Sequence, residues 1–156
     1  MLEVGSPIPD ITLRGVNPAG EEGEYRLADL LVPGKDLVLY FYPKDDTPGC
    51  TTEACDFRDG LATHGEKVVV VGVSPDAPTK HLKFQTKYGL PFTLLSDTEN
   101  KLMELFGAWG EKKNYGKVYV GVIRSTFVIG ADGVLKAVYR NVKATGHAER
   151  IYKSLA

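Results

Sequence analysis

The chain has 156 residues, of which 43% are hydrophobic and 25% are charged. This length and composition are typical of one folded domain, so we expect residues 1–156 to form a single domain without long disordered segments. The 19 Lys and Arg residues balance 20 Asp and Glu residues and are scattered along the chain, which argues against binding to nucleic acid.

The first half of the chain predicts a strand–helix–strand unit that follows an extended entry. Residues 1–36 are rich in glycine, proline and charge, and predict an extended segment with a weak hairpin. Residues 37–42 form a continuous apolar and aromatic run that is typical of a strand buried on both faces. A helix over about residues 50–63 and a second buried strand over residues 67–73 complete the unit.

The second half alternates helices and strands and then ends in a hairpin and a helix. We expect, in order, a helix over 74–88, a short strand over 93–96, a helix over 97–106, a long loop over 107–121 that borders a site, a hairpin formed by 125–130 and 134–139, and a helix over 147–155. The Asp132-Gly133 pair is typical of the hairpin turn. This alternation predicts an α/β protein with a central mixed sheet flanked by helices.

The N-terminus and the cysteine content bear on where the protein acts. The N-terminus has neither the basic nor the apolar region of a signal peptide, and no apolar run approaches the length that spans a bilayer. We therefore expect a cytoplasmic protein that binds no membrane. In a reducing compartment, a cysteine pair such as Cys50 and Cys55 is more often catalytic or metal-binding than a permanent disulfide.

The segment around Cys50 reads as the start of a helix. If Thr47 is the N-cap, Pro48 occupies the first helical position, where its missing N–H has no cost. Cys50 is then the third helical residue, and its N–H is the group that a Thr cap hydroxyl commonly binds. Thr47 and Cys50 are therefore expected to be neighbours.

A sulfur in the first turn of a helix suits peroxide chemistry. The positive end of the helix dipole favours thiolate over thiol, and a thiolate that attacks an O–O bond becomes a sulfenic acid. A second thiol can then condense with the sulfenic acid, and Cys55 is the one candidate within the chain. The alternative is that each cysteine is a small buried hydrophobe, and the spacing alone leaves that open for Cys55.

The five-residue spacing makes a structural prediction. In an intact helix, Cα atoms five residues apart are roughly 8.5 Å apart, and the two side chains diverge by about 140°. A disulfide needs Cα atoms within about 7 Å. A bond between Cys50 and Cys55 therefore requires the first turns of the helix to unwind.

This segment resembles the peroxiredoxins, and in particular their bacterioferritin-comigratory-protein or PrxQ subfamily. The superfamily pattern Pro-x-x-x-Thr-x-x-Cys is matched by Pro43, Thr47 and Cys50, and the subfamily spacing Cys-x-x-x-x-Cys is completed by Cys55. The similarity extends to residues 41–50, 71–74 and 124–127.

The resemblance implies a thioredoxin-like fold and a role for each residue that matches the family pattern. Cys50 would be the peroxidatic cysteine and Cys55 the resolving cysteine, joined in a disulfide during each turnover. Thr47 would bind the peroxide, Arg124 would stabilise the thiolate, Glu53 would orient Arg124, and Pro43 would shield the pocket. These assignments agree with the general rule that preorganised donors stabilise charge as it develops on a leaving oxygen.

The resemblance also implies the substrate and the reductant. Hydrogen peroxide and organic hydroperoxides would be reduced to water and alcohols, with thioredoxin or a similar dithiol as reductant and without a metal or an organic cofactor. The polar surface and the internal resolving cysteine favour a monomer.

Competing functions are weaker on the sequence. A general thiol–disulfide oxidoreductase is expected to carry Cys-x-x-Cys, and two cysteines without nearby histidines are too few ligands for a structural zinc ion. A redox-sensing or binding module switched by the same disulfide remains the alternative.

The remaining polar residues are predicted to have no role in catalysis or metal binding. We expect His64, His81 and His147 to be surface or capping residues, and Asp45 and Asp46 to be partners of the helix dipole.

Overall fold

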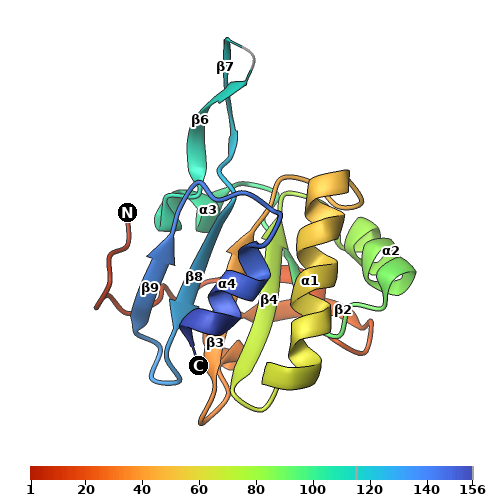
Figure 1. Cartoon of the computed structure of the whole chain (residues 1–156), viewed down its shortest axis with the longest axis vertical. Coiled ribbons are helices and arrows are strands. Elements are labelled where there is room, and N and C mark those ends of the chain that lie inside the picture. The colour runs from red at the N-terminus through yellow and green to blue at the C-terminus, as the bar shows by residue number, and fades with distance from the viewer. Residues whose placement is uncertain (115, 156) are drawn as a thin grey trace.

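The computed structural model describes residues 1–114 and 116–155, which form a seven-stranded mixed sheet flanked by helices (Figure 1). The strand order is β2-β1-β5-β4-β3-β8-β9. At its centre, β3 (Asp36–Phe41) pairs in parallel with β4 (Val68–Ser74) and antiparallel with β8 (Ser125–Ile129). The expected α/β class with a central mixed sheet is confirmed.

The other elements follow the predicted order along the chain. The remaining strands of the sheet are β1 (Thr12–Val16), β2 (Glu22–Arg26), β5 (Thr93–Ser96) and β9 (Leu135–Tyr139). The helices are α1 (Pro48–His64), α2 (Pro78–Tyr88), α3 (Lys101–Phe106) and α4 (His147–Ser154), with a short 3-10 helix η1 (Leu27–Leu30). The weak hairpin expected near the N-terminus is β1 paired with β2.

Alternate residues of β3 enter two separate cores, because successive side chains of a strand point to opposite faces of a sheet. Tyr40 stacks on Phe57 of α1 with ring centroids 4.6 Å apart, in the core that also contains Ile151 of α4. Phe41 contacts Phe106 of α3 in the other core. The prediction of a strand buried on both faces is therefore confirmed, and α1 and α4 lie side by side on one face (Figure 1).

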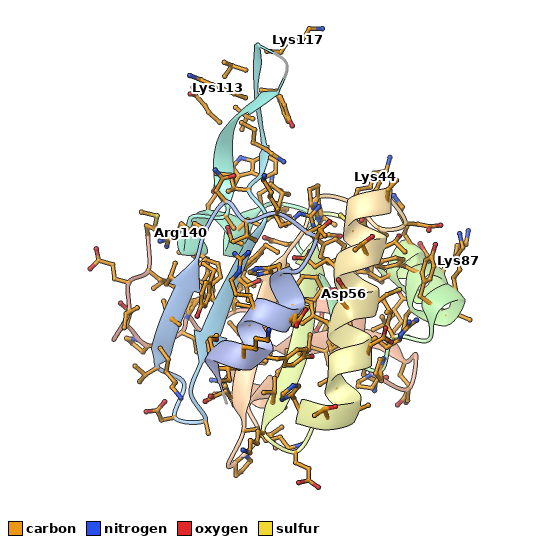
Figure 2. The ribbon with its side chains drawn as sticks, in the orientation of Figure 1. Lys44, Asp56, Lys87, Lys113, Lys117 and Arg140 are labelled. Carbon is orange, nitrogen blue, oxygen red and sulfur yellow. The ribbon has the colours of Figure 1, made fainter. Side chains whose placement is uncertain are left out.

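The segment predicted as a long loop over 107–121, of which residue 115 lies outside the described residues, contains two paired strands, so that prediction is wrong. It consists of β6 (Trp109–Asn114) and β7 (Lys117–Val122), which pair with each other outside the main sheet. The hairpin rises away from the body of the protein, with Lys113 and Lys117 towards its outer end (Figure 2). Strand β7 is exposed from Lys117 to Val120, and β6 from Trp109 to Lys113 is at most half-buried, so no buried face imposes the apolar alternation by which strands are recognised.

The helix expected from residue 97 begins at Lys101 instead. The Asp97 carboxylate accepts the backbone N–H of Met103 at 2.8 Å, and Asn100 at the N-cap has a positive φ of 61°. Residues 97–100 therefore form the turn that precedes the helix rather than its first turn. In the part of the chain that is described, no helix is both long and apolar enough to cross a membrane.

Candidate active site

Helix α1 begins as the sequence predicts. Thr47 is the N-cap, with φ −96° and ψ 156°, and Pro48 is the first helical residue. The Thr47 carbonyl accepts the first helical hydrogen bond from the Thr51 N–H at 2.8 Å. Cys50 therefore lies in the first turn of α1, at the positive end of the helix dipole.

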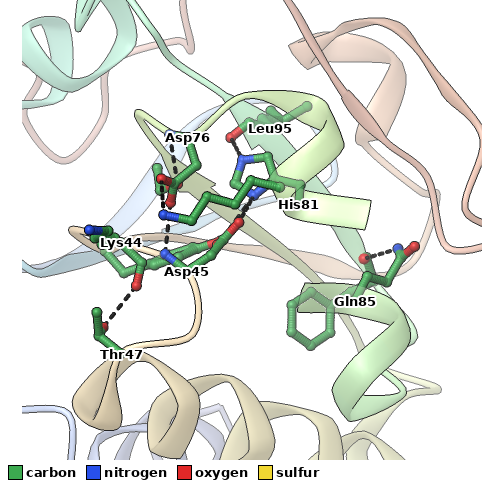
Figure 3. Close-up of polar contacts among 11 residues, drawn as sticks. Lys44, Asp45, Thr47, Asp76, His81, Gln85 and Leu95 are labelled. Atoms are coloured by element: carbon green, nitrogen blue, oxygen red, sulfur yellow. Dashed lines mark hydrogen bonds and ion pairs between the residues drawn. The ribbon is translucent and has the colours of Figure 1, made fainter. Parts of the chain in front are cut away.

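The Thr47 hydroxyl does not cap the helix, contrary to the expectation. It donates to the carbonyl of Lys44 at 2.8 Å and so closes the turn ahead of α1 (Figure 3). A hydroxyl has one hydrogen and two lone pairs, so this arrangement uses the hydrogen and leaves the lone pairs to accept another bond. The half-buried Pro43 opens the same loop, two residues after the end of β3.

Arg124 joins Cys50 to Glu53. One guanidinium nitrogen, Nη2, donates to the Cys50 sulfur at 3.3 Å, and the other, Nη1, donates to Glu53 Oε1 at 2.5 Å. The Arg124 side chain is 16% exposed, the Glu53 side chain is fully buried, and Cys50 is 1% exposed. The fold thus brings together three residues that the sequence separates by up to 74 positions.

The surroundings of Glu53 and Arg124 shift the pKa of each group. Burial raises the pKa of Glu53 to about 7, although the Arg124 cation opposes the shift. Burial disfavours the Arg124 cation, but the neighbouring Glu53 and Cys50 outweigh that effect and raise its pKa. Arg124 is therefore a permanent positive charge directed at the sulfur.

One residue of the β6–β7 hairpin is coupled electrostatically to this cluster. Burial lowers the pKa of Lys112 in β6, the Arg124 cation lowers it further, and Cys50 acts in the opposite direction. Lys112 is thus within electrostatic range of Arg124 and Cys50. That residues 107–121 border the site stays a prediction.

Cys55 lies farther along α1, half-buried, and both cysteines are free thiols. The helix is continuous from Pro48 to His64. In this state the two sulfurs belong to successive turns of one intact helix, on diverging faces.

His81 and His147, which were expected to be surface or capping residues, are buried, so that prediction is wrong for both. Asp45 is 2% exposed and contacts His81, which is fully buried, with 2.6 Å between Asp45 Oδ2 and His81 Nδ1. His147 is also fully buried, and its Nε2 lies 2.7 Å from Thr126 Oγ1. The partners are distant in sequence, so no local pattern could have identified them. His64, at the end of α1, stacks on Tyr152 with ring centroids 4.6 Å apart.

Comparisons with known proteins agree with this geometry. Residues 4–138 match the AhpC/TSA family. The chain is 49% identical to peroxiredoxin Bcp of Bacillus subtilis over 156 residues, which cover 99% of this chain and 95% of that relative. It is 46% identical to a putative peroxiredoxin bcp of Coxiella burnetii, over 96% of each chain.

Solved structures show the same relationship. A cysteine-to-serine mutant of Xylella fastidiosa PrxQ superposes with a TM-score of 0.87 at 33% identity, covering 99% of this chain and 96% of that one. The bacterioferritin comigratory protein of Xanthomonas campestris superposes with a TM-score of 0.80 at 36% identity, covering 92% and 89%. The sheet and its flanking helices are the thioredoxin-like fold of these neighbours. On sequence and fold together, this chain belongs to the AhpC/TSA family and is a peroxiredoxin of the Bcp/PrxQ group, a family of thiol peroxidases.

Proposed function

We propose that Cys50 reduces hydroperoxides and that Cys55 resolves the product as an intramolecular disulfide. The observation that carries this proposal is the Arg124 guanidinium, which donates to the Cys50 sulfur while Glu53 holds its other end. A cation and the helix N-terminus both favour thiolate, the reactive form of cysteine. The bacterioferritin comigratory protein of Xanthomonas campestris has alkyl peroxide reduction activity, and we extend this activity to the present chain.

The first step breaks the O–O bond. The Cys50 thiolate attacks one peroxide oxygen, the bond to the second oxygen breaks, and the leaving oxygen takes a proton from solvent to become water or an alcohol. Arg124 and the free lone pairs of the Thr47 hydroxyl are the groups that would hold the peroxide. Cys50 is left as a sulfenic acid.

The second step forms the disulfide. The Cys55 thiolate attacks the Cys50 sulfur, and the hydroxyl leaves with a proton as water. Because α1 is intact and holds the thiols on diverging faces, its first turns must unwind before the sulfurs meet. A dithiol reductant, which we infer to be thioredoxin, then returns both residues to thiols. We further infer that the protein acts as a single-domain monomer in the cytoplasm.

The test is peroxide consumption by the wild type, Cys50→Ser and Cys55→Ser, with thioredoxin, its reductase and NADPH supplying electrons. Cys50→Ser is expected to be inactive. Cys55→Ser is expected to form a sulfenic acid, visible by mass spectrometry, but not to turn over with thioredoxin. If the wild type and Cys50→Ser consumed peroxide equally slowly, the catalytic assignment of Cys50 would be wrong, and a redox-sensing module would be favoured.

Arg124→Lys is expected to reduce kcat/KM for peroxide by about 100-fold, the typical effect of losing one preorganised donor at a developing charge. A lysine keeps the charge but has no planar fork to bridge Cys50 and Glu53. Arg14→Lys, at an exposed ion pair on β1, is the control and should retain full activity. An Arg124→Lys enzyme as active as this control would contradict the role of the fork.

A further inference from the structure

The loop ahead of Cys50 is tied to α2 by a buried pair of side chains. Asp45 Oδ2 lies 2.6 Å from His81 Nδ1, and His81 Nε2 lies 2.9 Å from the backbone carbonyl oxygen of Leu95 (Figure 3). The second Asp45 oxygen accepts the Tyr42 hydroxyl at 2.5 Å. All the polar atoms of both side chains are therefore used.

The protons of this pair follow from its acceptors. A carbonyl oxygen only accepts, so His81 Nε2 must carry a hydrogen, and a second proton is shared between His81 Nδ1 and Asp45. The Asp45–His81 pair therefore carries no net charge. Each side chain also keeps a second hydrogen bond, Asp45 with the Tyr42 hydroxyl and His81 with the Leu95 carbonyl. Separating the pair would leave two polar groups unpaired in the protein interior, which is costly.

Further contacts fix the loop from both sides. The Asp45 N–H donates to Asp76 Oδ2 at 2.7 Å, and Lys80 of α2 holds the other oxygen of Asp76 at 3.1 Å. The next residue, Asp46, has a positive φ of 59° and accepts bonds from Lys87 Nζ at 2.8 Å and from the Tyr88 hydroxyl at 2.7 Å. Consecutive loop residues are therefore bound to the start and the end of α2.

These contacts bear on α1 because the loop leads directly into it. Thr47, whose carbonyl accepts the first hydrogen bond of α1, follows Asp46 and is itself bonded to the Lys44 carbonyl. An anchored loop fixes the position of that carbonyl and so favours a wound first turn. The proposed catalytic cycle requires this turn to open, yet it gives no task to Asp45 or His81.

We propose that Asp45 and His81 are positioning residues that latch the loop over 43–47 to α2 and hold the first turn of α1 wound between turnovers. The latch sets how often Cys50 leaves the site to meet Cys55. The consequence for catalysis rests on the proposed function, whereas the consequence for helix opening does not.

Weakening the latch should therefore affect two reactions of Cys50. Its reaction with peroxide slows, because the wound turn that aligns Thr47 and Arg124 with the sulfur is populated less. Over-oxidation also declines: the sulfenic acid leaves the site for Cys55 sooner, before a second peroxide can donate an oxygen to give sulfinic acid and another molecule of water or alcohol.

Thiol labelling tests the opening directly. Cys50 is 1% exposed, so a bulky aromatic disulfide reagent reaches it only when the first turn opens. In a Cys55→Ser background, His81→Leu is expected to label about tenfold faster than the parent, as the loss of a buried hydrogen-bonded partner implies.

Gln85→Leu is the matched control. Gln85 lies one turn after His81 on α2, is 5% exposed, and donates to the Asn17 and Phe92 carbonyls, so its hydrogen bonds lead away from the loop. Its labelling rate should stay within about twofold of the parent, although it also loses buried hydrogen bonds. Equal acceleration by His81→Leu and Gln85→Leu would overturn the latch.

A conservative variant distinguishes the loss of these hydrogen bonds from a general folding defect. In Asp45→Asn, the amide N–H₂ can donate to a neutral His81 Nδ1 while its oxygen still accepts the Tyr42 hydroxyl, so slow labelling should be retained. Asp45→Ala breaks both bonds and should label as fast as His81→Leu. Fast labelling of Asp45→Asn, with its secondary structure unchanged by circular dichroism, would contradict the hydrogen-bonded latch.

The catalytic consequence is measured with Cys55 present. The fraction of sulfinic Cys50, followed by mass spectrometry over a peroxide titration, should fall in His81→Leu and not in Gln85→Leu, while kcat/KM for peroxide falls only in His81→Leu. An unchanged sulfinic fraction in His81→Leu would overturn the link between latch and resolution. If the wild type reduces no peroxide, the proposed function fails, and the labelling rates still decide whether the latch exists.

Discussion

His147 is a buried histidine whose environment favours the neutral ring. It is fully buried at the start of α4, with one nitrogen near the Thr126 hydroxyl. Burial lowers its pKa to about 4, and the cations of Arg150 and Arg124 contribute to the shift. An unfolded histidine binds a proton near pH 6.5, so the unfolded state gains protons over this interval and the fold loses stability as the pH falls from about 6.5 to 4.

We therefore expect His147 to make the protein acid-sensitive. Between pH 7 and pH 4, the free energy of unfolding of the wild type should fall by roughly 3 kcal/mol relative to His147→Gln, which does not titrate. Urea unfolding at a series of pH values measures this difference. His64→Gln, at the half-buried C-terminal end of α1, is the control. If the difference in the free energy of unfolding between the wild type and His147→Gln did not change with pH, the fold would not hold His147 in its neutral form.

The titration of Glu53 changes the free energy of unfolding with pH in the opposite direction. For this reason the experiment compares variants with the wild type and does not use the wild type alone. Its pKa rises from an ordinary value of 4.5 to about 7, mainly because of burial. The fold therefore retains a proton that the unfolded chain has released, and this contribution to stability is lost as the pH rises from about 4.5 to 7. The two trends overlap in the wild type and are separated by replacing one residue at a time.

The packing of α1 against α4 depends on a glycine within α1. A Cβ added to Gly60 would lie 2.1 Å from the Tyr152 ring, and the Tyr152 hydroxyl donates to the Phe57 carbonyl at 2.7 Å. Glycine in a helix interior normally costs about 1 kcal/mol relative to alanine. Here the absence of a side chain lets the two helices approach, so the usual preference is reversed.

Gly60→Ala is consequently expected to lower the free energy of unfolding by about 1–3 kcal/mol, the typical range for overpacking. In a Tyr152→Ala background the clashing ring is gone, and the same substitution should stabilise the protein by about 1 kcal/mol instead. Thermal and urea unfolding of the four proteins give the coupling between the two sites. Stabilisation by Gly60→Ala in both backgrounds would refute the steric account.

At the scale of the whole molecule, the proposed cycle alternates between two folded states. The reduced state contains the continuous helix α1 from Pro48 to His64, whose Phe57 packs in the core with Tyr40. The oxidised state must unwind the turns that carry Cys50 and Cys55, which removes helical hydrogen bonds next to that core.

The oxidised wild type is therefore expected to show a weaker helical circular dichroism signal at 222 nm and a lower Tm than the reduced protein. Cys55→Ser treated with one equivalent of peroxide keeps its helix, because its sulfenic acid has no partner in the chain, and should show neither change. A complete Cys50–Cys55 disulfide by mass spectrometry with an unchanged helical signal would contradict unwinding.

The sequence by itself determined the elements whose signals are local. The apolar run over 37–42 predicted a strand buried on both faces, and the Thr47-Pro48 pair predicted where α1 begins. The family pattern selected Thr47, Cys50, Arg124 and Glu53, and the structure gathers Cys50, Glu53 and Arg124 within hydrogen-bonding distance. The strand and the start of α1 depend on periodicity and capping, which are properties of short segments. Glu53 and Arg124 depend on the resemblance to a known family.

Only the tertiary structure decided the rest. The direction of the Thr47 hydroxyl, the burial of His81 and His147, and the Asp45–His81 pair depend on which partners the fold brings within reach. In the β6–β7 hairpin, residues 109–113 and 117–121 pair across the two strands and include no buried side chain that would mark a strand pattern in the sequence. The physical reason is common to all of them: a polar side chain is matched to its hydrogen-bonding partner in space, and such partners can be dozens of residues apart in the sequence.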